Sequence, residues 1–130
     1  MKRFTPDEAE LMIPDLEKLF EAVAALAAQA QAKATEAGRL EENGAGAAET
    51  TLAKSQVRFL TAQIEEKLQS IVDLGAVPKG LEPALVDFPA VVEGRDVFLC
   101  WKLGEKSIDW YHGVEEGFSG RKRLKKRRAS

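Results

Sequence analysis

The sequence predicts an α+β fold in which a long antiparallel α-helical hairpin, with coiled-coil-like packing, precedes a small antiparallel β-hairpin or sheet module. Apolar residues recur every seven positions through residues 5–74, whereas apolar and polar residues alternate after Gly75. A chain of 130 residues has the length of a single domain. We divide it into a helical hairpin (5–74) with a turn within 38–48, a β-rich module (75–121) and a basic tail (122–130).

The first helix is expected to begin at a capping box. Thr5 is the N-cap, Pro6 is the first helical residue, and Glu8 reaches back to the Thr5 amide. The apolar stripe that follows is three rows wide, broader than one partner helix covers. Its rows are Ala9, Leu16, Val23, Ala30 and Ala37; Met12, Leu19 and Leu26; and Ile13, Phe20, Ala27 and Ala34. Pro14 removes the backbone bond to Glu10, which predicts a kink near the start of this helix.

Glycines interrupt the helical pattern at Gly38 and again within 43–46, where a left-handed backbone is tolerated. A second helix follows, and Gly75 is placed to cap it. Two long helices joined by a short connection run antiparallel and pack along a seam. Lys33 and Lys67 fall on the rows that form this seam. The apolar rows of the second helix are Ala53, Leu60 and Leu74; Val57, Ile64 and Ile71; with Phe59, Leu68 and Val72 beside them.

Alternating apolar residues predict a β-hairpin, and the two-residue connection Glu93-Gly94 suits a tight turn. The two runs are Val86, Phe88, Ala90 and Val92; and Val97, Leu99, Trp101 and Leu103. Pairing Val92 with Arg95 sets Asp87 across from Cys100 on one face. On the apolar face the same register pairs Phe88 with Leu99 and Val86 with Trp101. A further short strand or turn is expected through 108–111.

The charge is distributed unevenly along the chain. Seven of the 19 basic residues lie in 121–128, so the remaining 12 stand against 21 acidic residues. An acidic body repels phosphate backbones, which disfavours nucleic-acid binding through the body. With one cysteine, no signal-peptide pattern and no apolar run that spans a bilayer, we expect a cytoplasmic protein that is neither secreted nor inserted into a membrane.

Several stretches of the chain resemble a known family. They are Lys79-Gly80-Leu81-Glu82-Pro83-Ala84-Leu85-Val86-Asp87-Phe88-Pro89, Cys100-Trp101-Lys102-Leu103-Gly104-Glu105, Trp110-Tyr111-His112 and Gly117-Phe118-Ser119-Gly120-Arg121, together with the opening from Phe4-Thr5 to Pro14. In these residues the chain resembles the prokaryotic domain of unknown function 2203 family of uncharacterised small proteins. The resemblance implies a compact bacterial or archaeal protein with no assigned activity.

Polar residues of the β-rich module offer two kinds of chemistry. Asp87, Cys100, Glu105 and His112 are candidate metal or ligand contacts, since they supply carboxylate, thiolate and imidazole groups. Cys100 and His112 are also the one available thiol–imidazole pair, with Asp87, Glu105 or Asp109 to orient the ring. Their spacing matches no standard zinc pattern. The alternative is that Cys100 is an apolar filler and His112 a partly exposed hydrogen-bonding residue.

Trp101, Trp110 and Arg121 are candidate structural or site-supporting residues. Tryptophans at strand spacing are usually core, and Trp101 shares a face with other apolar residues. Arg121 is expected to lock the C-terminal turn by a bidentate pair with Asp87 or Glu105. The basic tail comprises Arg121, Lys122, Arg123, Lys125, Lys126, Arg127 and Arg128. It allows nucleic-acid contact, but it lacks interleaved aromatic residues, and a solvated tail folded onto its own domain is favoured.

The pattern favours a non-enzymatic interaction or oligomerisation protein that forms a homodimer, because the wide apolar stripe needs more cover than one helix provides. The alternative is a small metal- or ligand-binding protein, or an enzyme, with its site in the β-rich module. No cofactor or small-molecule ligand is specified by the sequence.

Overall fold

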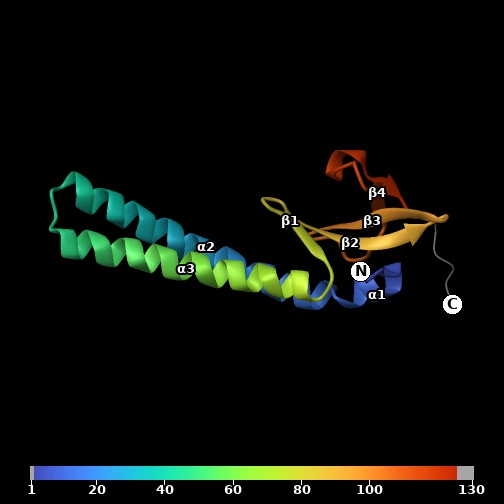
Figure 1. Cartoon of the computed structure of the whole chain (residues 1–130), viewed down its shortest axis with the longest axis horizontal. Coiled ribbons are helices and arrows are strands. Elements are labelled where there is room, and N and C mark those ends of the chain that lie inside the picture. The colour runs from blue at the N-terminus through green and yellow to red at the C-terminus, as the bar shows by residue number, and fades with distance from the viewer. Residues whose placement is uncertain (1, 126–130) are drawn as a thin grey trace. The chain divides into compact units, whose positions relative to one another are not determined.

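A computed structural model of the chain describes residues 2–125. The chain forms two compact units (Figure 1). The sheet unit comprises the chain up to Glu17 and from Ile71 onwards, and the helical arm comprises Lys18–Ser70. Among the described residues, no helix combines the length and the apolar character needed to cross a bilayer.

The N-terminal helix ends sooner than the apolar pattern predicts. α1 (Pro6–Leu11) starts at the predicted capping box, with side chain-to-amide bonds of 3.1 and 2.8 Å. The chain then turns at Met12, whose N–H forms a bond of 3.0 Å three residues back. Pro14 lies in the first turn of α2 (Ile13–Glu42), where its missing N–H leaves no helical bond unmade. The expected kink is therefore a break between two helices.

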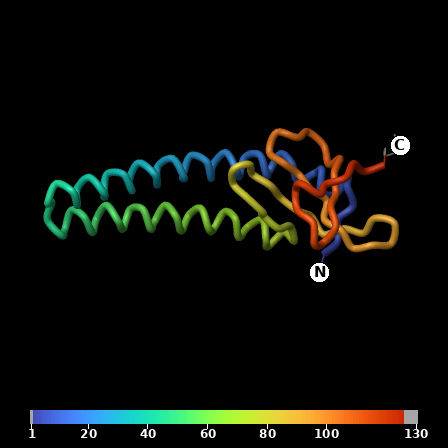
Figure 2. The backbone as a smooth tube through the Cα atoms, turned by 90° about the horizontal axis from the view of Figure 1, so that it is seen from above, coloured from blue at the N-terminus to red at the C-terminus, as the bar shows by residue number. Residues whose placement is uncertain are grey.

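The predicted helical hairpin is confirmed, with its turn inside the predicted range. Residues 43–46 connect α2 to α3 (Ala47–Asp73), and Figures 1 and 2 show the two helices side by side. Gly38 lies inside α2 and does not end it, since a helix tolerates a glycine at a cost of about 1 kcal/mol. Gly75 closes α3 as predicted, with φ of 96° and an N–H that donates to Val72 O at 2.9 Å.

The helical arm has a thin core. All of Lys18–Ser70 is described, and its buried side chains are Phe20, Val23, Ala37 and Ala53. Stabilisation by burial grows with the apolar area removed from water. An alanine-rich seam with few buried large residues therefore stabilises the arm weakly.

The sheet unit contains a five-stranded antiparallel sheet whose strands follow one another in chain order. The strands are β1 (Val77–Leu81), β2 (Ala84–Val92), β3 (Arg95–Lys102), β4 (Trp110–Gly113) and β5 (Lys122–Arg123), with the 3-10 turn η1 (Phe118–Gly120) before β5. The predicted pairing of β2 with β3 is confirmed in every pair. Glu93 and Gly94 both have positive φ, 52° and 77°, as a tight hairpin turn between twisted strands requires.

One face of the sheet carries the apolar core. The side chains of Val86, Phe88, Leu99 and Trp101 are fully buried there. The Phe4 ring lies edge-on to Phe88 with centroids 5.2 Å apart, and the Phe4 N–H donates to Pro89 O at 2.7 Å. The opposite face of β2, β3 and β4 holds Asp87, Cys100 and His112, with Pro89 and Phe98 beside them.

Candidate functional site

Three polar side chains meet on the face of the sheet opposite the apolar core. Asp87 on β2 pairs directly with Cys100 on β3, and His112 lies on β4 across from Phe98. Their ligand-type atoms, a carboxylate oxygen, Sγ and a ring nitrogen, all lie within 4.8 Å of one another. All three residues are at most 3% exposed. We call Asp87, Cys100 and His112 the polar cluster.

The hydrogen bonds of His112 determine how protons are placed in the polar cluster. Nδ1 lies 2.8 Å from Gly113 O, and because a carbonyl only accepts, Nδ1 carries a hydrogen. Nε2 lies 3.0 Å from Asp87 Oδ2. Two unprotonated acceptors would repel at that distance, so one proton is held between the imidazole and the carboxyl. The pair therefore has no net charge.

Burial disfavours negative charge at both other members of the polar cluster. It raises the pKa of the Asp87 carboxyl, although the hydrogen bond from His112 acts in the opposite direction. Burial also raises the pKa of the Cys100 thiol to about 11, opposed by the Arg121 charge. Catalytic thiols have a lowered pKa. The Cys100 thiol is thus protonated at neutral pH. Its buried environment does not favour nucleophilic catalysis, which requires the thiolate.

Glu105, the fourth predicted ligand, is engaged elsewhere. Both of its carboxylate oxygens accept from Arg121 Nη2, at 2.9 and 2.8 Å, and its Oε1 also accepts from the Lys102 amide at 2.8 Å. The Arg121 guanidinium lies 4.7 Å from the Trp110 ring and 4.6 Å from the Phe118 ring. The pair between Arg121 and Glu105 ties the segment after β4 to the end of β3.

Trp101 belongs to the core, as its position on the apolar face predicts. Its side chain is fully buried, and its indole N–H donates to Glu105 O at 2.9 Å. That bond satisfies the one polar atom of the side chain. Trp101 therefore lies in the core and holds the Glu105 loop by this hydrogen bond.

The described part of the basic tail is held by acidic residues of the same chain. Lys122 Nζ lies 3.6 Å from Glu116, and Lys125 Nζ lies 2.7 Å from Glu93. Arg123 lies over the Trp110 ring, 5.2 Å from its centroid. Lys126, Arg127 and Arg128 lie outside the described residues.

A second candidate site lies on the helical arm. Leu52 and Phe59 of α3 are 61% and 65% exposed. They are seven residues apart on one row of the helix. The sequence pattern placed Phe59 beside the apolar rows of this helix, and it marked neither residue as functional. Their spacing of seven residues, about two helical turns, was the sequence pattern that could have identified them as one row.

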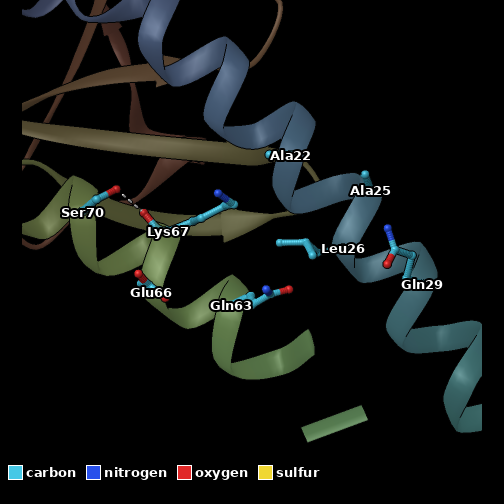
Figure 3. A pocket seen from close by; sticks show the side chains of 8 residues that line it. All are labelled: Ala22, Ala25, Leu26, Gln29, Gln63, Glu66, Lys67 and Ser70. Atoms are coloured by element: carbon cyan, nitrogen blue, oxygen red, sulfur yellow. Dashed lines mark hydrogen bonds between the residues drawn. The ribbon is translucent and has the colours of Figure 1, made fainter. Parts of the chain in front are cut away.

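A groove of about 700 Å³ runs between α2 and α3 (Figure 3). Its lining residues are Ala22, Ala25, Leu26, Gln29, Gln63, Glu66, Lys67 and Ser70. Figure 3 shows Leu26 and Lys67 pointing from α2 and α3 into the space between the helices. Lys67 occupies a row of the predicted seam, and at this position the two helices are separated by the groove.

Comparison with known proteins identifies a family and no activity. No curated protein and no solved structure matches the chain. A family model described as "Uncharacterized conserved protein (DUF2203)" matches residues 2–124. This match spans the helical arm and the sheet unit together. The chain therefore belongs to the domain of unknown function 2203 family.

Proposed function

We propose that the protein is an interaction module that forms a homodimer through the outer face of α3. The observation that carries this proposal is the exposure of Leu52 and Phe59, 61% and 65%, on one row of a helix. Burying a leucine or phenylalanine side chain contributes about 1.5–3 kcal/mol. A second copy that covers both residues would add core to an arm that has little of its own.

Charges on α3 favour a second copy of this chain as the partner. Arg58 donates to the Ser55 hydroxyl at 3.2 Å. Within the described chain, neither Arg58 nor Glu65 nor Glu66 forms an ion pair with another residue. The middle of the helix thus carries an unpaired cation at Arg58 and unpaired carboxylates at Glu65 and Glu66.

An antiparallel pair of α3 helices would match these charges. Arg58, Ala62 and Glu66 are spaced four residues apart and share one face of α3. A two-fold axis near Ala62 would set Arg58 of each copy beside Glu65 and Glu66 of the other, and the small Ala62 would allow close approach. A parallel pair would set like charges together. The two hairpins would then form a four-helix arrangement.

Charge reversal tests this proposal. We expect Arg58→Glu to weaken the dimer by about tenfold or more, because like charges would face each other twice across the two-fold axis. The triple variant Arg58→Glu with Glu65→Arg and Glu66→Arg restores opposite charges and should restore the dimer. Light scattering coupled to size-exclusion chromatography measures the mass, and circular dichroism checks the helix content.

Arg39→Glu is the matched control, since Arg39 is an exposed arginine of the arm on α2. It should leave the dimer intact. Equal dimerisation by Arg58→Glu and the native chain would rule out the α3 interface, and so would a triple variant that stays as weak as Arg58→Glu.

A further inference from the structure

We propose that Asp87, Cys100 and His112 form a binding site for one borderline or soft divalent metal ion, such as Zn²⁺, Co²⁺ or Fe²⁺. The ligands would be one Asp87 carboxylate oxygen, the Cys100 sulfur and His112 Nε2. This site lies in the sheet unit and is independent of the interface on α3. Metal binding at this site does not require a dimer.

The distances between the three ligand atoms are close to those that a tetrahedral ion requires. Zinc bonds of about 2.0–2.3 Å at tetrahedral angles set neighbouring ligand atoms about 3.4–3.6 Å apart. In the polar cluster Nε2 and Oδ2 are 3.0 Å apart, and all three atoms lie within 4.8 Å of one another. Changes of about 1.4 Å or less in these separations would complete the geometry. The ion would replace the direct contact between His112 and Asp87.

His112 already has the second hydrogen bond that a metal-binding histidine needs. Metal-ligating imidazoles usually donate their other ring N–H to a backbone carbonyl or a carboxylate, which fixes the tautomer and the ring orientation. Nδ1 donates to Gly113 O at 2.8 Å. This bond leaves Nε2 as the nitrogen that faces Asp87 and Cys100.

Charge balance supports an ion of charge +2. Without metal, the site holds a neutral thiol and one proton between Asp87 and His112, so it is neutral overall. Binding would release the Cys100 proton and the shared proton, leaving a thiolate, a carboxylate and a neutral imidazole around M²⁺. That site is again neutral, which avoids the high cost of burying net charge. The exchange is therefore one ion bound for two protons released.

The chemistry of the ligand set selects the metal. Thiolate and imidazole ligands suit zinc, cobalt and iron, whereas Mg²⁺ and Ca²⁺ prefer sets of oxygen ligands. Three protein ligands leave a fourth tetrahedral position for water or another small ligand. Glu105 is held by Arg121, so it is not the fourth protein ligand in this arrangement.

Cobalt titration of the full-length chain, purified without an affinity tag and stripped with a chelator, tests the site. Because the polar cluster is buried, Co²⁺ is added both to folded protein and during refolding. We expect one ion per chain, a thiolate-to-cobalt charge-transfer band in the near ultraviolet, and displacement by Zn²⁺ but not by Mg²⁺. Calorimetry in buffers of different ionisation enthalpy should count about two protons released per ion.

Variants identify the ligands. Cys100→Ser should abolish the charge-transfer band, and His112→Gln should weaken binding by more than about 100-fold, since even second-shell partners contribute 10–100-fold. Asp96→Asn is the matched control: this exposed carboxylate lies on the same strand as Cys100 and should bind cobalt like the native chain. Circular dichroism checks that each variant is folded.

The titration of the native chain does not depend on any variant folding. Folded native protein that binds less than one equivalent of Co²⁺ and of Zn²⁺ under both conditions would overturn the proposal. So would a charge-transfer band that persists in Cys100→Ser. Either result would leave the α3 interface untouched.

Discussion

Leu52 and Phe59 lie seven residues apart on one row of α3, and both side chains are more than half exposed. The buried residues of the arm, by contrast, include two alanines, Ala37 and Ala53. The arm thus exposes two large apolar side chains, while two of its four buried residues are alanines, so it has little core of its own.

Dilution should lower the thermal stability of the native chain. A dimer that forms only from folded chains has a melting temperature that rises with concentration. Replacing both Leu52 and Phe59 by alanine should remove that concentration dependence and preserve the helix content. Thermal unfolding followed by circular dichroism at several concentrations measures the effect. Concentration-independent melting of the native chain would contradict the proposed interface.

A cysteine at position 62 should cross-link two copies. In an antiparallel pair centred near Ala62, the two equivalent residues approach to the distance that a disulfide spans, about 4.4–6.8 Å between Cα atoms. We expect Ala62→Cys, made together with Cys100→Ala, to form a covalent dimer under mild oxidation. Non-reducing electrophoresis detects it. Thr51→Cys, exposed near the start of α3 and far from the axis, is the control and should cross-link much less.

Removing Arg121 should destabilise the sheet unit. Its side chain is 11% exposed and both Glu105 oxygens accept from it. Arg121→Met would leave a mostly buried carboxylate without its cation, and we expect a loss of about 2–3 kcal/mol in the free energy of unfolding. Lys122→Met, which removes an exposed pair with Glu116, should have no measurable effect. Urea unfolding compares the two, and equal losses would contradict the structural role of Arg121.

The metal-free sheet unit should lose stability at alkaline pH through Cys100. Burial raises the pKa of this thiol from 9.0 to about 11. The unfolded chain therefore releases the proton at a lower pH than the folded chain does. The stability contributed by the protonated thiol is complete below pH 9 and is lost as the pH rises towards 11, by about 2–3 kcal/mol.

Cys100→Ala isolates this contribution, because it removes the thiol and leaves every other titrating group. Urea unfolding of chelator-treated protein across this pH range should show a steeper decline for the native chain than for the variant. If the free energy of unfolding declines with pH equally in the native chain and the variant, the thiol has the same pKa in the folded and unfolded states.

The sequence pattern predicts much of the fold because caps, turns and strand register depend on residues close together in the chain. The Glu93-Gly94 turn fixes the pairing of β2 with β3, so the position of Asp87 opposite Cys100 follows from it. The break at Met12 was not predicted, since the apolar rows continue through it. β1 and β5 were also missed. β1 contains an irregularity between Pro78 and Gly80 that hides its alternation, and β5 has two residues.

The candidate site was only partly predictable for the same reason. The register predicts that Asp87 and Cys100 face each other, but His112 joins them through the pairing of β3 with β4, which no turn signal specifies. Glu105 could bind either the cluster or Arg121. The sequence contains both options, and the tertiary contact with Arg121 decides between them.

The mass of the native chain in solution tests the proposed homodimer most directly. Sedimentation equilibrium at micromolar concentrations should give about twice the chain mass of 14.3 kDa, with dissociation on dilution. A single species at the chain mass throughout that range would contradict the proposed homodimer.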